Sequence, residues 1–373
     1  MSLESEINQK AIEIQTDQYP ISIGEIISIY ENKELDIHPQ FQRYFRWKKL
    51  QKSKFIESIL LGIPIPPIFV AQRKDGIWDV VDGLQRLSTI FEFVGKLIDK
   101  DGNTLPKPCL FATEYLPSLE NKYWESDEEM YSFPDSVKID FKRKKLNFVI
   151  VKKESDEEVK FDIFQRLNTL GSQLSNQEIR NCLLIMIDPG FNDWLRDLAN
   201  YPPFLDSIQL SERYKNEQFD MELALRFFVY KNAPIEEISK SKDVDELLTH
   251  QMRRFSSDPS FNRKEEERIF KATFDIIGKV LGSDTFKKYF PQEERFKGQF
   301  LISAFEVVAI GLGKNIDYWE EKEIEEIRDI LSKKIKSIWS NDTFTSNSGS
   351  GSNVSSRLPA LLPLGMRLFE NGD

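Results

Sequence analysis

The sequence predicts an α+β chain in which a small mixed α/β module is followed by a mostly α-helical domain. Runs with β-strand character stand at 68–70, 78–81 and 145–151, whereas from 191 to 339 apolar residues recur at the three-four spacing of amphipathic helices. A chain of 373 residues is also too long for one ordinary hydrophobic core. We therefore expect a lead-in at 1–20, an α/β module at 21–185, a helical domain at 186–340, and a flexible Ser/Gly tract with an apolar tail at 341–373.

The composition narrows the class of protein. With 30% charged and 40% hydrophobic residues, no membrane-length apolar run and no signal peptide, we expect a cytoplasmic protein that does not contact a membrane. Two cysteines, Cys109 and Cys182, do not make a disulfide framework or a structural zinc site. Two histidines, His38 and His250, leave little for histidine-based nuclease chemistry. The net charge of −10 argues against a general nucleic-acid coat but permits a local basic patch.

Proline and glycine mark the ends of the first elements of the module. In chain order we expect a helix at 22–30, a strand at 35–37, a helix at 50–61, a hairpin of strands at 68–70 and 78–81, and a later strand at 145–151. Pro39 stops the first strand, and Gly62 is typical of a helix C-cap. Prolines at 64, 66 and 67 stiffen the entry to the hairpin.

The stretch around which the module is organised runs from Trp78 to Val94. A β-prone run turns at Asp82-Gly83, and from Leu84 the apolar residues follow helical spacing. A strand that turns on glycine into a helix directs backbone N–H groups and a helix dipole to one point, which suits a phosphate. Arg86 could bind a phosphate or a carboxylate, and Asp82 could cap the helix or hold a metal or a water. The alternative is a capped strand-to-helix corner with a surface arginine.

A second signal is a reversal of charge in an otherwise acidic chain. No acidic residue occurs between His38 and Phe55, but six basic ones do: Arg43, Arg46, Lys48, Lys49, Lys52 and Lys54. Interleaved with aromatic residues, this pattern favours phosphate binding, mainly through Gln42, Arg43 and Arg46. The alternative is a solvated basic helix face.

Two boxes resemble a known family. The segment Pro39-Gln40-Phe41-Gln42-Arg43 and the later Val81-Asp82-Gly83-Leu84-Gln85-Arg86-Leu87 are similar to the N-terminal domain of GmrSD-type modification-dependent restriction proteins, itself similar to the ParB/sulfiredoxin fold. In the family the second box usually reads Asp-Gly-Gln-Gln-Arg, so Leu84 replaces a glutamine here. That departure puts nucleotide preference and hydrolysis in doubt.

A third stretch strengthens the resemblance. The string from Phe164 to Asn181 is similar to the same family and follows the other boxes in the expected order. Asn168, Arg180 and Asn181 could therefore complete a nucleotide pocket. Ser175 and Glu178 also have the spacing of a capping box, so a purely structural role for this stretch stays open.

The resemblance implies a site and a setting. It implies binding of a nucleoside triphosphate of unknown base with Mg²⁺ or a similar divalent metal near Asp82. Asp82 and Arg86 would be catalytic if the nucleotide is hydrolysed, and Gly83, Gln85, Gln42, Arg43, Arg46, Asn168, Arg180 and Asn181 would bind it. The implied setting is phage defence or restriction, with DNA and a separate nuclease as partners. The sequence leaves homo-oligomerisation open.

Two further readings concern nuclease activity and DNA. Asp135, Glu158 and Lys160 match a loose metal-nuclease signature, but such matches arise by chance in a chain this rich in charge. Many relatives carry a C-terminal His-metal finger nuclease, whereas this chain has one histidine, His250, after residue 200. We therefore expect the resemblance to cover roughly the first 230 residues. A non-enzymatic module whose boxes bind DNA phosphates is the main competing function.

Overall fold

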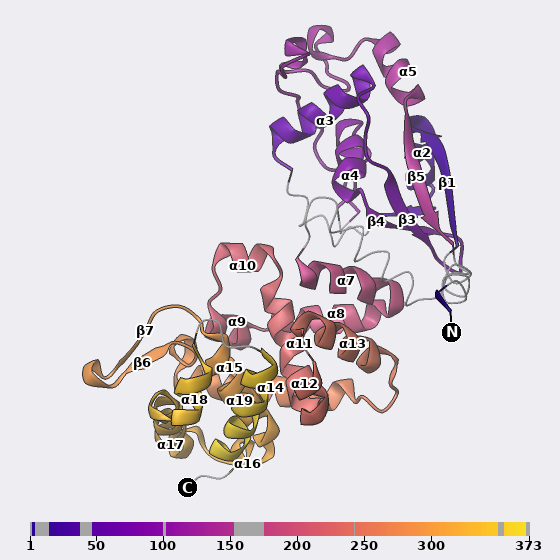
Figure 1. Ribbon diagram of the computed structural model, residues 1–373. Coiled ribbons are helices and arrows are strands. Elements are labelled where there is room, and N and C mark those ends of the chain that lie inside the picture. Colours follow the sequence, from indigo (N-terminus) through magenta and orange to yellow (C-terminus); the bar gives the residue numbers. More distant parts are fainter. Residues whose placement is uncertain are drawn as a thin grey trace. The chain divides into compact units, whose positions relative to one another are not determined.

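The computed structural model describes residues 2–3, 15–37, 47–99, 102–152, 175–241, 243–349 and 354–370 (Figure 1). The chain divides into two compact units, Met1–Gln173 and Leu174–Asp373. This division differs from the expected one at 185/186, which falls inside helix α7 (Asn176–Ile187).

A five-stranded mixed sheet forms the centre of the first unit. Its strands are β1 (Thr16–Ser22), β2 (Leu35–Asp36), β3 (Ile68–Gln72), β4 (Trp78–Asp82) and β5 (Lys145–Val151), in the order β1-β5-β3-β4-β2. The β1/β5 and β3/β4 pairs are antiparallel, and the β3/β5 and β2/β4 pairs are parallel. The predicted hairpin and the predicted strand at 145–151 are confirmed.

Helices cover this sheet and share its hydrophobic core. They are α2 (Ile23–Glu31), α3 (Lys49–Leu61), α4 (Leu84–Phe93) and α5 (Asp135–Arg143), with 3-10 turns η2 (Pro117–Leu119) and η3 (Glu129–Tyr131). Tyr30 of α2 stacks on Phe91 of α4 with ring centroids 4.1 Å apart. Gly62, with φ 73°, ends α3 as predicted, whereas Ser22, which the expected helix at 22–30 included, precedes α2 and caps it.

The expectation of a loose lead-in at 1–20 was wrong for residues 16–20. Residues 16–20 belong to strand β1, which pairs with β5 over all seven of its residues. β1 lies at an edge of the sheet, where Pro20 can be accommodated because an edge strand leaves some N–H positions unpaired. Its partner lies more than a hundred residues away, so local pattern could not reveal the pairing.

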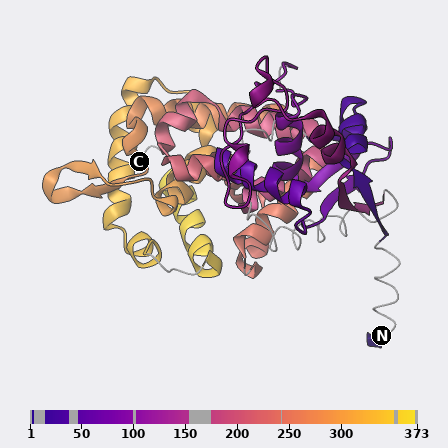
Figure 2. The same ribbon diagram turned by 90° about the horizontal axis from the view of Figure 1, so that it is seen from above.

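The second unit is mostly helical, as predicted. Its helices are α7 (Asn176–Ile187), α8 (Pro189–Ala199), α9 (Pro202–Ile208), α10 (Glu212–Asn216), α11 (Phe219–Asn232), α12 (Ile235–Lys240), α13 (Val244–Ser257), α14 (Arg263–Val280), α15 (Ile302–Lys314), α16 (Ile316–Glu320), α17 (Ile324–Ser337), α18 (Asp342–Asn347) and α19 (Val354–Leu368), with 3-10 turns η4 (Gly282–Asp284), η5 (Pro291–Glu293) and η6 (Ile338–Ser340). A small hairpin of β6 (Lys288–Phe290) and β7 (Arg295–Lys297), which was not predicted, projects from these helices (Figures 1 and 2).

The Ser/Gly tract that was predicted to be flexible spans 341–356, and its described residues, 341–349 and 354–356, are more helical than expected. Helix α18 occupies 342–347, and α19 packs against α15. Arg357 of α19 donates two hydrogen bonds, of 3.0 and 2.9 Å, to the buried carboxylate of Glu306 in α15. A Cβ atom on Gly365 would clash with the carbonyl oxygen of Val307. The glycine therefore allows the backbones of α19 and α15 to lie close together.

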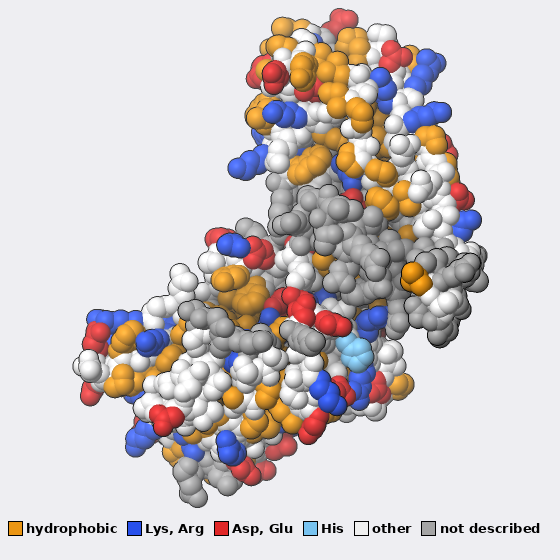
Figure 3. Space-filling view, in the orientation of Figure 1, with side chains coloured by type: hydrophobic (Ala, Val, Ile, Leu, Met, Phe, Trp, Pro, Cys, Tyr) orange, Lys and Arg blue, Asp and Glu red, His pale blue; other side chains and the backbone are white. Residues whose placement is uncertain are grey.

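Side chains of both charge signs alternate over the visible surface of each unit (Figure 3). Within the described part of the chain, no helix combines the length and apolar character needed to span a membrane.

Candidate functional site

The predicted strand–turn–helix corner is confirmed. Strand β4 ends at Asp82, Gly83 takes φ 105°, and α4 begins at Leu84. A Cβ atom on Gly83 would lie 2.4 Å from Cδ1 of Ile68 in the neighbouring strand β3. The corner therefore needs glycine both for its left-handed backbone and for its close packing.

The N-terminus of α4 has no side-chain cap. Asp82, which could have capped it, instead accepts a hydrogen bond from Arg86, with Nη2 and Oδ2 2.7 Å apart. Arg86 belongs to the first turn of α4, so the Asp82 carboxylate is bound there through a side chain, whereas the N-cap position itself has no side-chain cap. This is the feature of the corner that suits an anion.

Arg86 holds the corner to the proline segment before β3. Its Nη1 atom donates to the carbonyl oxygen of Pro66 and, at 3.0 Å, to that of Pro67. The arginine side chain is only 11% exposed. In the structure the guanidinium therefore binds acceptors of the protein itself, which is a role that the sequence did not indicate.

Gln85 connects the second box to Trp47, which follows the first box by four residues. Its Oε1 atom accepts a hydrogen bond of 3.3 Å from the backbone N–H of Trp47. On the other side of the first box, β2 ends at Asp36, which pairs in register with Asp79 of β4. The described residues on the two sides of the first box therefore contact the corner elements: Asp36 lies beside β4, and Trp47 is bonded to α4. Gln42, Arg43 and Arg46 themselves lie outside the described residues.

Arg180 and Asn181 belong to the second unit, whereas Asp82 to Arg86 belong to the first. Arg180 is 1% exposed, and its guanidinium donates to Glu222 at 2.6 Å, to Asp245 at 2.9 Å and to Gln177 at 2.8 Å. Asn181 accepts a bond of 2.8 Å from Gln177.

The buried arginine network extends further along α11. Arg226 donates to the same Glu222 carboxylate at 2.7 and 3.0 Å, and to the hydroxyl of Tyr230 at 2.7 Å. Because each cation has a carboxylate partner, these contacts tie α7, α11 and α13 together. Arg180 is thus in a structural network of its own unit.

The predicted capping box that begins α7 is confirmed. The Ser175 side chain accepts from the N–H of Glu178, and the Glu178 carboxylate accepts from the N–H of Ser175 at 2.6 Å. Asn168 lies outside the described residues, as do Glu158 and Lys160 of the nuclease signature. Asp135 begins α5 with its side chain 91% exposed and pairs with Lys138 at 3.2 Å.

The carboxylates do not gather into a preformed metal centre in the described residues, among which no three His, Cys, Asp or Glu side chains are placed to hold an ion. Asp82 alone fits a divalent ion that arrives with a nucleotide, because Mg²⁺ is commonly held by one or two carboxylates together with substrate phosphates. It does not fit an ion held by the protein alone.

Two features at the end of β4 away from the corner were missed in the sequence. Arg73 bridges Asp79, at 2.8 Å from Nε, and Asp36, at 2.7 Å from Nη2. Burial by itself lowers the pKa of Arg73, but Asp79 and Asp36 together raise it above its usual value.

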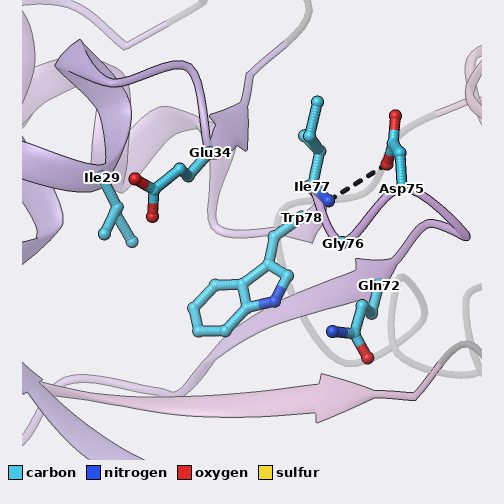
Figure 4. Close-up of a pocket in the computed structure, with 7 residues that line it drawn as sticks. All are labelled: Ile29, Glu34, Gln72, Asp75, Gly76, Ile77 and Trp78. Atoms are coloured by element: carbon cyan, nitrogen blue, oxygen red, sulfur yellow. Dashed lines mark hydrogen bonds between the residues drawn. The ribbon is translucent and has the colours of Figure 1, made fainter.

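The second feature is a cavity of about 390 Å³ at this same end of β4, beside Trp78 (Figure 4). Neither feature has a local sequence signature.

The family model described as GmrSD restriction endonuclease, N-terminal domain, matches residues 23–185. The match starts at the first residue of α2 and ends within α7, so it covers less of the chain than the roughly 230 residues expected. No curated protein and no solved structure matches the chain. Residues 23–185, which make up less than half of the chain, are therefore similar to GmrSD restriction endonuclease N-terminal domains.

Proposed function

We propose that the first unit binds a nucleoside triphosphate with its phosphates at the N-terminus of α4. The observation that carries this proposal is the corner itself, where Gly83 turns β4 into a helix end that no side chain caps. Backbone N–H groups and the helix dipole at such an end stabilise anions.

The first box supports the same location. It begins three residues after Asp36, which is in register with Asp79, and ends four residues before Trp47, whose N–H donates to Gln85. The segment between Asp36 and Trp47, which contains Gln42, Arg43 and Arg46, is therefore joined at its two described ends to strand β4 and helix α4. Arginines are well suited to fork onto phosphate oxygens.

Asp82 and Arg86 are proposed to do the chemistry if hydrolysis occurs. A bound nucleotide would bring the divalent ion, which neutralises phosphate charge, and Asp82 would contribute one carboxylate ligand. Phosphates at the corner compete with Asp82 for Nη2 of Arg86, while the bonds from Nη1 to Pro66 and Pro67 keep the guanidinium in place. When the Asp82–Arg86 bond breaks, the Asp82 carboxylate would become available to the ion and Nη2 of Arg86 would become available to a phosphate.

The setting proposed for this activity comes from the family, whose description names a restriction endonuclease. We propose that nucleotide binding, with or without turnover, regulates a DNA-directed restriction system as a sensor or switch. DNA and a separate nuclease are the proposed partners. Position 84 is a leucine rather than the glutamine usual in the family, so turnover is the step that this departure would affect most.

Binding and release of phosphate from each of the four ribonucleoside triphosphates with Mg²⁺ tests the proposal. The variants are Asp82→Asn, which keeps size but removes charge, and Arg86→Lys, and Arg143→Lys at an exposed position of α5 is the matched control. We expect both corner variants to weaken binding or turnover at least tenfold and the control to resemble the parent chain. Circular dichroism spectra of all variants check that the fold is retained.

Three outcomes divide the possibilities. Turnover lost in Asp82→Asn supports a hydrolase, and binding without turnover supports a nucleotide-gated switch. If no nucleotide binds at millimolar concentration, the proposal is wrong. In that case DNA affinity that falls steeply with salt, and that Arg86→Lys weakens, would indicate a module that binds DNA phosphates.

A further inference from the structure

A cavity of about 390 Å³ opens at the end of β4 opposite the Gly83 corner (Figure 4). It lies between the β3–β4 turn and the segment that joins α2 to β2. Its lining includes the indole of Trp78, the carboxylates of Glu34 and Asp75, the amide of Gln72, and the apolar side chains of Ile29 and Ile77. Since β4 spans five residues, the cavity is about 13 Å along the strand from Asp82.

The indole is held in position from several sides. Its ring meets Tyr19 of β1 at 6.3 Å and 64°, and Phe148 of β5 at 6.3 Å and 37°. The backbone N–H of Trp78 donates to the carbonyl oxygen of Glu34 at 2.9 Å. In Figure 4 the ring lies between the side chains of Glu34 and Gln72. The cavity therefore has a preformed aromatic wall rather than a mobile one.

The cavity is acidic. Among its described lining residues two carry a negative charge and none carries a positive one. Lys33 and Lys74 adjoin Glu34 and Asp75 in sequence but are not lining residues. Asp75 accepts a hydrogen bond from the N–H of Ile77 at 3.1 Å, which fixes its carboxylate at the turn. Such a site repels phosphates and carboxylates and attracts cations.

We propose that this cavity binds the head group of an organic cation, a guanidinium or an ammonium. An indole in a cavity that two carboxylates also line provides the cation–π and charge contacts that recognise such groups. Gln72 adds an amide oxygen that can accept a hydrogen bond from the ligand. The volume is near the lower end of the range of about 300–1,000 Å³ for small-molecule sites, so it suits a head group rather than a whole nucleotide. The site is independent of the proposed phosphate site.

Two sources could supply this chemistry, an arginine or lysine side chain of a partner protein or a free polyamine. Titration of the full chain with N-acetyl-arginine methylamide, N-acetyl-lysine methylamide and spermidine separates them. The indole N–H signal of Trp78, assigned by its loss in Trp78→Phe, reports occupancy by NMR. The uncharged nucleosides cytidine and guanosine test whether the wall instead stacks a base.

We expect saturable shifts of the Trp78 signal with at least one cation and weaker binding as salt rises. Glu34→Gln, which keeps the shape of the side chain, should weaken binding about three- to tenfold. Glu114→Gln, an exposed glutamate of the same unit that does not line the cavity, is the matched control and should leave binding unchanged. Trp78→Leu should abolish saturation, as followed by the signals of neighbouring backbone amides.

The outcomes are decisive. Stronger binding of the amino-acid amides supports a partner side chain, and stronger binding of spermidine supports a free amine. Saturation by a nucleoside without any by the cations would overturn the proposal in favour of a base-stacking site. Equal affinity of Glu34→Gln and the parent chain, or no shift with any probe, would overturn it as well.

Discussion

The guanidinium of Arg86 lies 2.7 Å from the carboxylate of Asp82, four residues before it, and this pair closes the corner between β4 and α4. The same guanidinium also binds the carbonyl oxygens of Pro66 and Pro67. One side chain thus joins the end of a strand, the start of a helix and the proline segment. A phosphate at the corner would have to share this arginine with the protein.

Replacement of Arg86 by alanine should lower the free energy of unfolding by about 2–3 kcal/mol. It leaves two carbonyl oxygens and a partly buried carboxylate without their donor. Urea denaturation of the full chain, followed by circular dichroism, measures the change. Lys96→Ala removes an exposed pair with Glu31 and should change little. An unchanged unfolding curve for Arg86→Ala would show that the arginine does not brace the corner.

Gly83→Ala should cost about 2–4 kcal/mol of stability. The added Cβ meets Ile68 at 2.4 Å, and φ 105° is strained for alanine. Gly76, with φ 92° and no atom within 4 Å of an added Cβ, is the matched control. Gly76→Ala carries only the backbone strain, about 1–2 kcal/mol. Thermal unfolding of both variants therefore separates the loss of stability caused by the clash with Ile68 from the loss caused by backbone strain.

A second substitution tests the steric contact directly. Ile68→Val removes the Cδ1 atom that the added Cβ would meet, and by itself should cost about 0.5–1.5 kcal/mol. In the double variant Gly83→Ala/Ile68→Val the loss should be smaller than the sum of the two single losses. Strict additivity would mean that the contact between these two residues does not limit the corner.

Arg180→Ala should destabilise the second unit by about 3 kcal/mol. It leaves the carboxylates of Glu222 and Asp245 without one cation, although Glu222 keeps Arg226. Calorimetry of the full chain measures the loss. Arg213→Ala, which removes an exposed pair with Glu217, is the control and should leave the transition in place. A variant that unfolds like the parent but binds nucleotide more weakly would restore the predicted pocket role of Arg180.

The parts of the fold with local signatures were predictable. Serine before an apolar run, glycine at a helix end and the Asp82-Gly83 turn each specify a backbone geometry through one or two residues, and the structure confirms α2, α3 and the corner. The three-four spacing likewise predicted α13, α14 and α17, whose buried residues follow one face.

Features made by distant residues were not predictable. Strand β1 depends on β5, and the partners of Arg86 are carbonyl groups about twenty residues earlier, which have no sequence signature. The cavity beside Trp78 combines α2, the segment that joins α2 to β2, and the β3–β4 turn, so its acidic character emerges only when these segments meet. The resemblance to a family identified the residues of the corner but not their contacts.

The last prediction concerns stability in alkaline solution. Tyr201 donates a hydrogen bond of 2.6 Å to Asp275, and burial, together with this carboxylate, raises the pKa of its phenol from 10.0 to about 12. In the unfolded chain the phenol ionises near 10, so between pH 10 and 12 the unfolded state loses its proton first. The stabilising contribution is therefore complete below pH 10 and is lost as the pH rises to about 12.

Tyr201→Phe should remove this part of the pH dependence. Difference titration of phenolate absorbance, parent minus variant, should place the missing ionisation near 12. Asp275→Asn keeps the size of the partner but removes its charge, so it should move the pKa of Tyr201 down towards 10. A missing ionisation near 10 in the first experiment would mean that the Tyr201–Asp275 contact does not persist in solution.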